Sequence, residues 1–249
     1  MKRIVFIGVI FCLFCVQGAM AQTLEDITFM TEELPPYNYT VAGERRGISI
    51  DVLEAALTAV GVTKDMADVE VYPWARVYDA IRWVPMTCGF AAVRIPQRES
   101  LFKWAGPIVD FADVCLVKKK NITIENPEDL KKYIICAVRD SSPHQALLAL
   151  GCSEDRLELS NSVQNALNKM EYGRADIFIG DKRTTFYTME QMGLDLDLYK
   201  VCYTFNKVYG YFAFNSQTPD SVVESLQRGI DAIRASGKLN QILKKYQAH

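Results

Sequence analysis

Histidine is scarce in this 249-residue chain, in which His144 and His249 are the only two. Histidine is a frequent zinc ligand and the usual general base of a serine triad. A histidine-based metal site or a serine hydrolase is therefore hard to build from this sequence. We expect no bound metal and no cofactor.

An excess of basic residues is also lacking. Once Lys2 and Arg3 of the N-terminal segment are set aside, the 28 basic residues fall to 26 against 30 acidic ones, a net charge of −4. The basic residues are scattered apart from the cluster 118–120, which is more simply a solvated turn. Nucleic-acid binding requires a concentrated positive surface. We therefore expect no nucleic-acid partner.

A long hydrophobic run occurs only at the N-terminus. Lys2 and Arg3 precede an apolar stretch from Ile4 to Val16, and Ala19 and Ala21 supply small residues before Gln22. This order is typical of a secretory signal peptide. We expect cleavage after residue 21 and release of a soluble periplasmic protein.

Two other interpretations of the N-terminus are weaker. The apolar run is shorter than the ~20 residues that a membrane-spanning helix needs. A lipoprotein signal would use Cys15, but Leu13 and Phe14 before it are too bulky for that processing site.

Cysteine is limited to five residues beyond the signal peptide. Their number is odd and their spacing matches no zinc pattern. Three of them lie in apolar, strand-like runs, where cysteine behaves as a small buried hydrophobe. A disulfide between the other two is an open alternative in an oxidising compartment. In chain order the five are Cys88, Cys115, Cys136, Cys152 and Cys202.

Strand-like and helical patterns alternate along the rest of the chain. The hydrophobic periodicity predicts strands at 27–30, 69–72, 88–93, 112–117, 134–138, 176–179 and 209–214. It predicts helices at 51–60, 76–83, 143–150, 163–170 and 183–192, a start at 126–127, and two more helices between 222 and 246. Such alternation indicates βαβ units around mainly parallel sheets. No low-complexity linker divides the chain, which favours two α/β lobes that it traverses more than once.

Seven short motifs follow one another in an order that resembles a known family. The chain is similar to the bacterial periplasmic solute-binding proteins of the polar-amino-acid type, which serve ABC transporters. The segment Tyr72-Pro73-Trp74-Ala75-Arg76 resembles a less characterised branch. The seven motifs are Leu34-Pro35-Pro36-Tyr37, Gly47-Ile48-Ser49-Ile50-Asp51-Val52, Ile95-Pro96-Gln97-Arg98, Phe102-Lys103-Trp104-Ala105-Gly106-Pro107, Pro127-Glu128-Asp129-Leu130, Gly173-Arg174-Ala175-Asp176 and Gly237-Lys238-Leu239 with Lys245-Tyr246.

The resemblance implies a two-lobed α/β fold. Each lobe would be an open, mainly parallel sheet flanked by helices, and two hinge strands would join the lobes. Lobe 1 would comprise residues 22–114 and 208–249, and lobe 2 residues 115–207. Ligands of such sheets collect beyond the carboxyl ends of the strands, so the cleft between the lobes is the expected site.

Two positions are candidates for binding a carboxylate. By resemblance, Arg98 matches the arginine that clamps the ligand carboxylate, and a guanidinium group offers a planar fork suited to two oxygens. Ser142 matches a carboxylate-binding hydroxyl of the family. We expect Ser142 to cap a helix that Pro143 opens, with free N–H groups that attract anions. A plain surface arginine and a plain helix cap are the alternatives.

Asp181 follows a predicted strand and matches the acidic residue that pairs with a ligand ammonium in the family. Because aspartate also caps helices well, a structural role at the start of the next helix is equally open. Asp140 lies close to Ser142 in the sequence and would oppose an anion there. Asp51 also matches a family motif but opens a helix, so we interpret it as structural.

Aromatic and further cationic residues could complete the cleft. Tyr37 and Trp74 both follow proline in expected loops, where an aromatic face can stack on a ligand. Packing between a strand end and a helix is the alternative for Trp74. Arg76 and Arg94 add positive charge near the same predicted sheet edge.

One departure from the family concerns the strand before Arg98. Amino-acid-binding members carry small hydroxyl residues there, whereas this chain has the sequence Phe90-Ala91-Ala92-Val93-Arg94. Their absence leaves two ligand classes open, a zwitterionic amino acid and an anionic organic acid.

Three functions are compatible with these features. The first is capture of a small anionic or zwitterionic solute, by a monomer, for import through an ABC permease. The second is ligand sensing with the external domain of a membrane receptor. The third is a periplasmic cyclohexadienyl-type dehydratase, which needs a poised general acid. Glu33 and Glu44 lie near the expected cleft without a recognisable catalytic partner, so we expect no enzyme.

Overall fold

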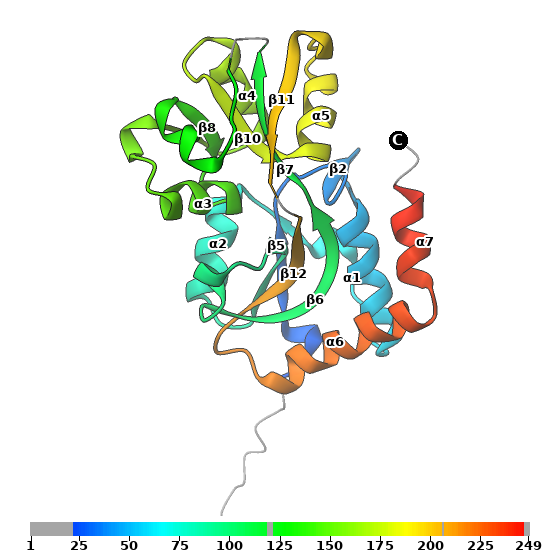
Figure 1. Ribbon diagram of the computed structural model, residues 1–249. Helices are drawn as coiled ribbons and strands as arrows, with labels where there is room; N and C mark the ends of the chain where they lie inside the picture. Colours follow the sequence, from blue (N-terminus) through cyan, green and yellow to red (C-terminus); the bar gives the residue numbers. More distant parts are fainter. Residues whose placement is uncertain (1–21, 119–121, 206, 247–249) are drawn as a thin grey trace, which may run out of the picture.

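The computed structural model describes residues 22–118, 122–205 and 207–246. The predicted signal peptide, residues 1–21, lies outside these described residues. Two five-stranded sheets, each with helices on both faces, form two lobes stacked one above the other (Figure 1). No helix within the described ranges is long and apolar enough to cross a membrane.

Lobe 1 is built on a sheet with strand order β4-β1-β5-β12-β6. The strands β4, β1 and β5 run parallel, whereas β12 is antiparallel to both β5 and β6. The strand bounds are β1 Thr28–Thr31, β4 Glu70–Val71, β5 Thr87–Val93, β6 Phe102–Phe111 and β12 Val208–Asn215. The helices are α1 Ile48–Ala59, α2 Trp74–Trp83, α6 Asp220–Ala235 and α7 Lys238–Lys245, and a small hairpin joins β2 Tyr39–Val41 to β3 Glu44–Arg46.

Lobe 2 is built on a sheet with strand order β11-β7-β10-β8-β9. The strands β10, β8 and β9 are parallel, whereas β7 is antiparallel to β10 and β11. The strand bounds are β7 Asp113–Lys118, β8 Ile135–Val138, β9 Leu157–Ser160, β10 Ile177–Asp181 and β11 Tyr199–Thr204. The helices are α3 Ser142–Leu150, α4 Val163–Glu171 and α5 Lys182–Gln191.

The chain crosses between the lobes twice. Ala112 alone separates β6 from β7, and residues 205–207 separate β11 from β12. These four crossing strands supply the antiparallel pairs, so both sheets are mixed. The predicted division at 114/115 assigns Asp113 and Val114 to lobe 1, whereas both residues lie in β7 of the second sheet.

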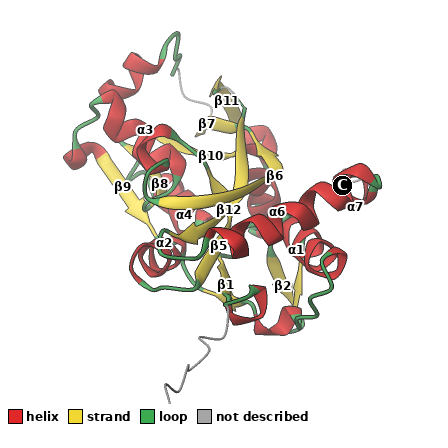
Figure 2. Ribbon diagram, turned by 90° about the horizontal axis from the view of Figure 1, so that it is seen from below, coloured by secondary structure: helices red, strands yellow, loops and turns green. Residues whose placement is uncertain are grey.

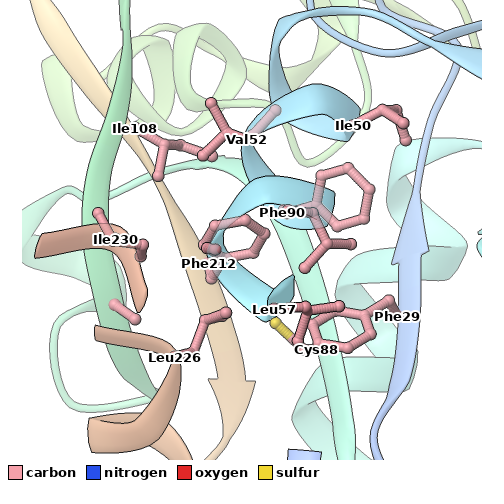
Figure 3. Packing of buried hydrophobic residues seen from close by; sticks show 14 of the residues in the cluster. Phe29, Ile50, Val52, Leu57, Cys88, Phe90, Ile108, Phe212, Leu226 and Ile230 are labelled. Atoms are coloured by element: carbon pink, nitrogen blue, oxygen red, sulfur yellow. The ribbon is translucent and has the colours of Figure 1, made fainter. Parts of the chain in front are cut away.

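The core of lobe 1 combines aliphatic side chains with a group of phenylalanine rings. Phe212 lies 6.5 Å from Phe29 and 5.7 Å from Phe90 between ring centroids (Figure 3). Helices α1 and α6 cover this face, and α2 covers the other face of the sheet (Figure 2). The helix α6 approaches α1 so closely at Gly229 that a Cβ there would lie 2.2 Å from the carbonyl oxygen of Ala56.

The core of lobe 2 consists mainly of aliphatic side chains and small residues, among them buried cysteines. All five cysteines of the described chain are free thiols. The disulfide considered between Cys152 and Cys202 is therefore wrong, and the Cys202 thiol instead lies 3.4 Å from the carbonyl oxygen of Cys115.

Local signals in the sequence set the starts of several helices. Asn126 accepts a hydrogen bond from the N–H of Glu128, as its capping role predicts, but the segment Pro127–Lys132 is a short 3-10 helix. The helix α3 begins one residue earlier than expected. Ser141, not Ser142, is its cap, because the Ser141 hydroxyl accepts from the N–H of His144 at 3.3 Å.

Candidate functional site

A cavity of about 70 Å³ lies between the two lobes. It is located where β1 and β5 of lobe 1 and β8 and β10 of lobe 2 reach their carboxyl ends, which is where open α/β sheets bind ligands. Its walls are mostly apolar. The residues that line it are Glu32, Leu34, Trp74, Ala91, Val93, Arg98, Phe111, Asp113, Val138, Ser141, Ser142, Pro143, Val163, Phe178, Ile179, Gly180 and Asp181.

Arg98 connects the lobes at this cavity. It ends the short 3-10 helix Pro96–Arg98 and is 1% exposed. Its Nη1 donates to the carbonyl of Val93 in lobe 1 at 3.1 Å. In lobe 2, its Nη2 donates to the carbonyl of Asp140 at 2.6 Å and its Nε donates to Oε1 of Gln145 at 3.1 Å. Burial lowers the pKa of Arg98 to about 10, so it is cationic at neutral pH.

The carbonyl of Asp140 also accepts a hydrogen bond from Trp74 of lobe 1, whose Nε1 lies 2.8 Å away. Asp140 has a φ of 57°, in the left-handed region. The guanidinium carbon of Arg98 lies 5.5 Å from the centre of the Trp74 ring and 5.1 Å from that of Tyr78. One lobe 2 carbonyl thus accepts from two large lobe 1 side chains, which lie within cation–π distance of each other.

A second connection between the lobes involves Tyr37 and Asp181. The Tyr37 hydroxyl lies 3.2 Å from Oδ2 of Asp181 and 3.1 Å from the carbonyl oxygen of Asp110. Asp181 also accepts from the N–H of Ala112 at 3.1 Å and caps α5 by accepting from the N–H of Thr184 at 3.0 Å. Burial raises the pKa of Asp181, and these hydrogen bonds oppose the rise.

Two more carboxyl groups line the cavity. Glu32 follows the last residue of β1, and Asp113 opens β7; both are half-buried. Burial raises the pKa of Glu32 to about 8 despite the opposing charge of Arg98. Burial and the charge of Asp181 raise the pKa of Asp113 to about 7, again against the effect of Arg98. The cavity therefore combines one guanidinium group with three carboxyl groups.

A two-lobed fold with a partly polar cavity at facing strand ends is typical of proteins that enclose a small solute. Residues 27–249 match the family described as bacterial extracellular solute-binding proteins, family 3. The chain belongs to this family.

Among relatives of this solute-binding protein is the Bacillus subtilis (strain 168) protein named "Probable amino-acid-binding protein YxeM". It is 21% identical over 214 residues, which cover 85% of this chain and 79% of the relative.

Solved structures share the fold at low sequence identity. One is a histidine kinase sensor domain with similarity to periplasmic binding proteins, with a TM-score of 0.77 at 16% identity over 88% of this chain and 95% of that one. Another is the arginine-, lysine-, histidine-binding protein ArtJ of Geobacillus stearothermophilus, with a TM-score of 0.73 at 18% identity over 90% of this chain and 96% of that one.

The structure brings together four of the seven residues that the sequence singled out. Arg98, Ser142, Asp181 and Trp74 line the cavity of the solute-binding protein. Tyr37 does not line it; it is fully buried behind Asp181, with its ring 4.4 Å from that of Phe111. These placements leave the binding roles as proposals.

Arg76 and Arg94 are both exposed and do not line the cavity. The Arg76 guanidinium lies 3.8 Å from the centre of the Tyr72 ring. Arg94 forms an ion pair with Glu99 on the surface and lies near the rings of Trp104 and Tyr211. Neither residue replaces the hydroxyl groups missing from β5. Instead, Ala91 of β5 contacts the cavity with a φ of 56°, where the pairing of β5 with β12 shifts register.

Sequence reasoning missed Glu32, Asp113 and Gln145. Glu32 could have been found, because it lies two residues after a predicted strand and so stands at the binding edge of the sheet. The acidic residues considered in its place point elsewhere: Glu33 accepts hydrogen bonds from Thr40, and Glu44 pairs with Arg46 in the β2–β3 hairpin.

Proposed function

We propose that this protein captures a small solute with both an amino and a carboxylate group, of the amino-acid type, in the interlobe cavity. The proposal places it outside the cytoplasmic membrane, where it would deliver the solute to an ABC-type permease. The observation that carries it is the charge composition of the cavity, one guanidinium and three carboxyl groups at facing strand ends. The amino-acid-binding name of the Bacillus subtilis relative supports the same class.

The charge of the cavity favours a zwitterion over a purely anionic organic acid. An organic acid would oppose the ionisation of Glu32, Asp113 and Asp181 in a poorly solvated space, which is costly. A zwitterion offers its ammonium group to the carboxyl groups. Its carboxylate would turn to Arg98, which has five N–H donors, three of which donate to Val93, Asp140 and Gln145 in the described part of the chain.

The first turn of α3 would assist Arg98 in holding the carboxylate. Ser142 is the first residue of that helix and lines the cavity with Ser141 and Pro143. Free N–H groups at a helix start stabilise an anion. Both lobes would then contact one solute, and their closure around it would be the output.

Sensing is the second candidate function, since a histidine kinase sensor domain shares the fold. Import and sensing both need only a closed shape around the solute. The two are separated by asking which membrane protein the ligand-loaded protein binds, the permease of an ABC transporter or a receptor ectodomain.

Thermal-shift screening of refolded, ligand-stripped protein against amino acids and organic acids tests the proposed class. A solute at 100 times its Kd raises the stability by about 2.7 kcal/mol. We expect amino acids to give the largest shifts. A shift with organic acids alone would refute the zwitterion assignment, and conversion of prephenate or arogenate by the protein would favour the dehydratase alternative.

A further inference from the structure

The residue at the centre of the lobe connection is itself held by a histidine. The carbonyl of Asp140 receives the hydrogen bonds of both Arg98 and Trp74. The N–H of the same residue donates to Nδ1 of His144 at 3.0 Å. His144 is 7% exposed and is the only histidine in the part of the chain that the structure describes. One buried imidazole therefore contacts the residue on which the connection depends.

The start of α3 explains how the imidazole reaches this N–H. Ser141 caps the helix by accepting from the N–H of His144, which is the third residue of α3. In a capping box, a glutamate or glutamine at that position accepts from the N–H of the cap residue. Here the ring of His144 accepts from Asp140, the residue immediately before the cap. The acceptor of this capping arrangement is thus a group that titrates near neutral pH.

Asp140 adopts a conformation that needs such support. Its φ of 57° lies in the left-handed region, which is unfavourable for residues other than glycine, although aspartate tolerates it better than most. On one side the turn is held by the N–H of Arg139, which donates to the carbonyl of Ser160 at 2.8 Å. The bond to His144 is made by the N–H of Asp140 itself, so its loss would release the residue whose carbonyl faces lobe 1.

Protonation of His144 is incompatible with this hydrogen bond. Nδ1 accepts only when the ring is neutral with its proton on Nε2, whereas a protonated ring has donors at both nitrogens. The Nδ1–H group would then face the N–H of Asp140, donor against donor. The carboxylate of the same aspartate is an alternative partner, since its Oδ1 lies 3.9 Å from Nδ1. A proton would therefore move the hydrogen bond of the imidazole from the backbone of Asp140 to its side chain.

Burial and nearby charges determine when the ring is protonated. Burial is the largest influence and lowers the pKa of His144, so the ring is neutral at pH 7. The nearby cation Arg139 lowers this pKa further, whereas Asp140 and Glu154 oppose the effect. Two more charged residues line a surface groove beside the ring and form an ion pair with each other at 2.8 Å, namely Glu158 of β9 and Lys169 of α4.

We propose that His144 is a positioning residue: its neutral imidazole holds the carbonyl of Asp140 where lobe 1 reaches it, and its protonation in mild acid weakens the connection between the lobes. His144 is not among the described residues that line the cavity, so it acts through Asp140 and not by touching a solute. The consequence for solute capture rests on the proposed function, since a weaker connection would favour release.

The indole N–H of Trp74 reports the connection without any solute. In ligand-free protein, we expect its ¹H–¹⁵N signal, assigned with Trp74→Phe, to shift between about pH 8 and pH 5 with the midpoint of the His144 ring. The ¹⁵N spectrum of that ring should show the Nε2–H tautomer above the midpoint. Because Glu32 and Asp113 titrate in part of the same range, the comparison with His144→Asn removes their contribution.

Two variants separate positioning from packing. In His144→Asn the amide oxygen can replace Nδ1 as an acceptor but does not titrate, so the Trp74 signal should stay as in the wild type at pH 8 and lose the inflection of His144. His144→Ala has no acceptor, and its Trp74 signal at pH 8 should resemble that of the wild type at pH 5. Both variants lose the ring, so rescue by asparagine identifies the hydrogen bond as the cause. His249→Asn, which removes the other histidine of the chain, is the control and should titrate like the wild type.

The effect on solute capture follows by linkage. Titration calorimetry with the common L-amino acids at about pH 8 and pH 5 measures it. We expect each one that binds at pH 8 to lose about fivefold or more in affinity at pH 5, beyond the loss seen in His144→Asn.

The outcomes separate the two proposals. A Trp74 signal without an inflection at the midpoint of His144 would overturn the positioning role, and so would identical pH profiles for the wild type and His144→Asn. Either result leaves the solute-binding function standing. The expected inflection, together with no amino acid bound at either pH, would refute the proposed solute class and retain the role of His144.

Discussion

The two lobes contribute different chemistry to their shared interface. Lobe 1 offers side-chain donors, namely Arg98, Trp74 and Tyr37. Lobe 2 offers acceptors, namely the carbonyl of Asp140, the amide oxygen of Gln145 and the carboxylate of Asp181. Arg183 is the exception, a lobe 2 side chain whose Nη1 lies 3.4 Å from the carbonyl oxygen of Asp110.

This difference affects what mutation can do. A backbone acceptor cannot be removed by substitution, so the connection through Asp140 depends on the lobe 1 residues that reach it. The left-handed conformation at Asp140 and the first turn of α3 beside it fix the position of that carbonyl. Lobe 2 thus presents an acceptor in a fixed position, and the lobe 1 side chains that donate to it determine how strongly the two lobes are connected.

The largest effect should come from Arg98→Ala. The substitution removes three hydrogen bonds, two of which join the lobes, and leaves a buried ligand carboxylate without its partner. Such truncation costs about 2–5 kcal/mol, or roughly 30- to 4000-fold in affinity. Calorimetry with the best ligand from the screen measures the loss, and solution scattering should show no compaction on ligand addition.

Arg98→Lys serves as a control for charge. It retains the cation but cannot reproduce the three-way hydrogen bonding of the planar guanidinium group, so it should bind with intermediate affinity. Full binding by Arg98→Ala would mean that the carboxylate is held elsewhere and that Arg98 is a structural link between the lobes.

The second effect concerns pH. The folded-state pKa values of Glu32 and Asp113 are raised to about 8 and about 7, above those of the unfolded chain. The unfolded chain therefore loses these protons first as the pH rises. The stability of the ligand-free protein should fall between about pH 4 and pH 8, by several kcal/mol from these two groups. Chemical denaturation across this range measures it.

The double variant Glu32→Gln, Asp113→Asn isolates that contribution. Its stability curve should be flatter than that of the wild type by the same amount, since all other titrating groups are shared. Parallel curves for the two proteins would show that neither carboxyl group loses hydration on folding.

A smaller effect is expected for Asp181→Asn. Asparagine has one acceptor oxygen, whereas Asp181 accepts from the N–H groups of both Ala112 and Thr184. One of these donors loses its partner, at a cost of about 1–2 kcal/mol. Asp195→Asn is a matched control, because among the described residues the Asp195 side chain accepts only from the N–H of Asp197, where it caps a short helix, and it should be nearly neutral.

Asp181→Asn also tests the ligand class. If Asp181 binds an ammonium group, affinity should fall by at least about tenfold together with stability. Unchanged affinity would assign Asp181 to capping alone and would revive the organic-acid alternative.

Elements with strong local periodicity were predictable from the sequence. The spacing of Val52, Leu53, Ala56 and Leu57 gives α1 its buried face. The strand β6 was missed because its exposure does not alternate along the ten residues Phe102–Phe111. It pairs with β12 through a register shift between Gly210 and Phe212, which breaks the period of two.

The candidate site was predictable only where a residue follows a strand or begins a helix. Asp113 gave no such signal, because it stands at the start of a strand. It reaches the binding edge only because β7 runs antiparallel to β10 and pairs it with Asp181. Arg94 and Arg98 are four residues apart, yet one is exposed and the other buried. Long-range pairing, which no local pattern encodes, determines both outcomes.

The smallest effect should come from Trp74→Phe. The phenyl ring keeps an apolar wall against Tyr78 and the cavity but cannot donate to the carbonyl of Asp140. That carbonyl retains its hydrogen bond from Arg98, so no buried acceptor is left unpaired. The cost should be about 0.5–1 kcal/mol in stability, with a loss of affinity below about fivefold.

A double-mutant cycle that combines Trp74→Phe with Arg98→Lys sharpens the comparison of the lobes. If both side chains hold lobe 2 through the one carbonyl, removing the first makes the second more important, and the coupling energy should lie in the range of about 0.5–3 kcal/mol. Calorimetric affinities of the four proteins measure it. Additive effects would mean that Trp74 and Arg98 act on separate features of lobe 2, and loss of binding in Trp74→Phe alone would make Trp74 the dominant link between the lobes.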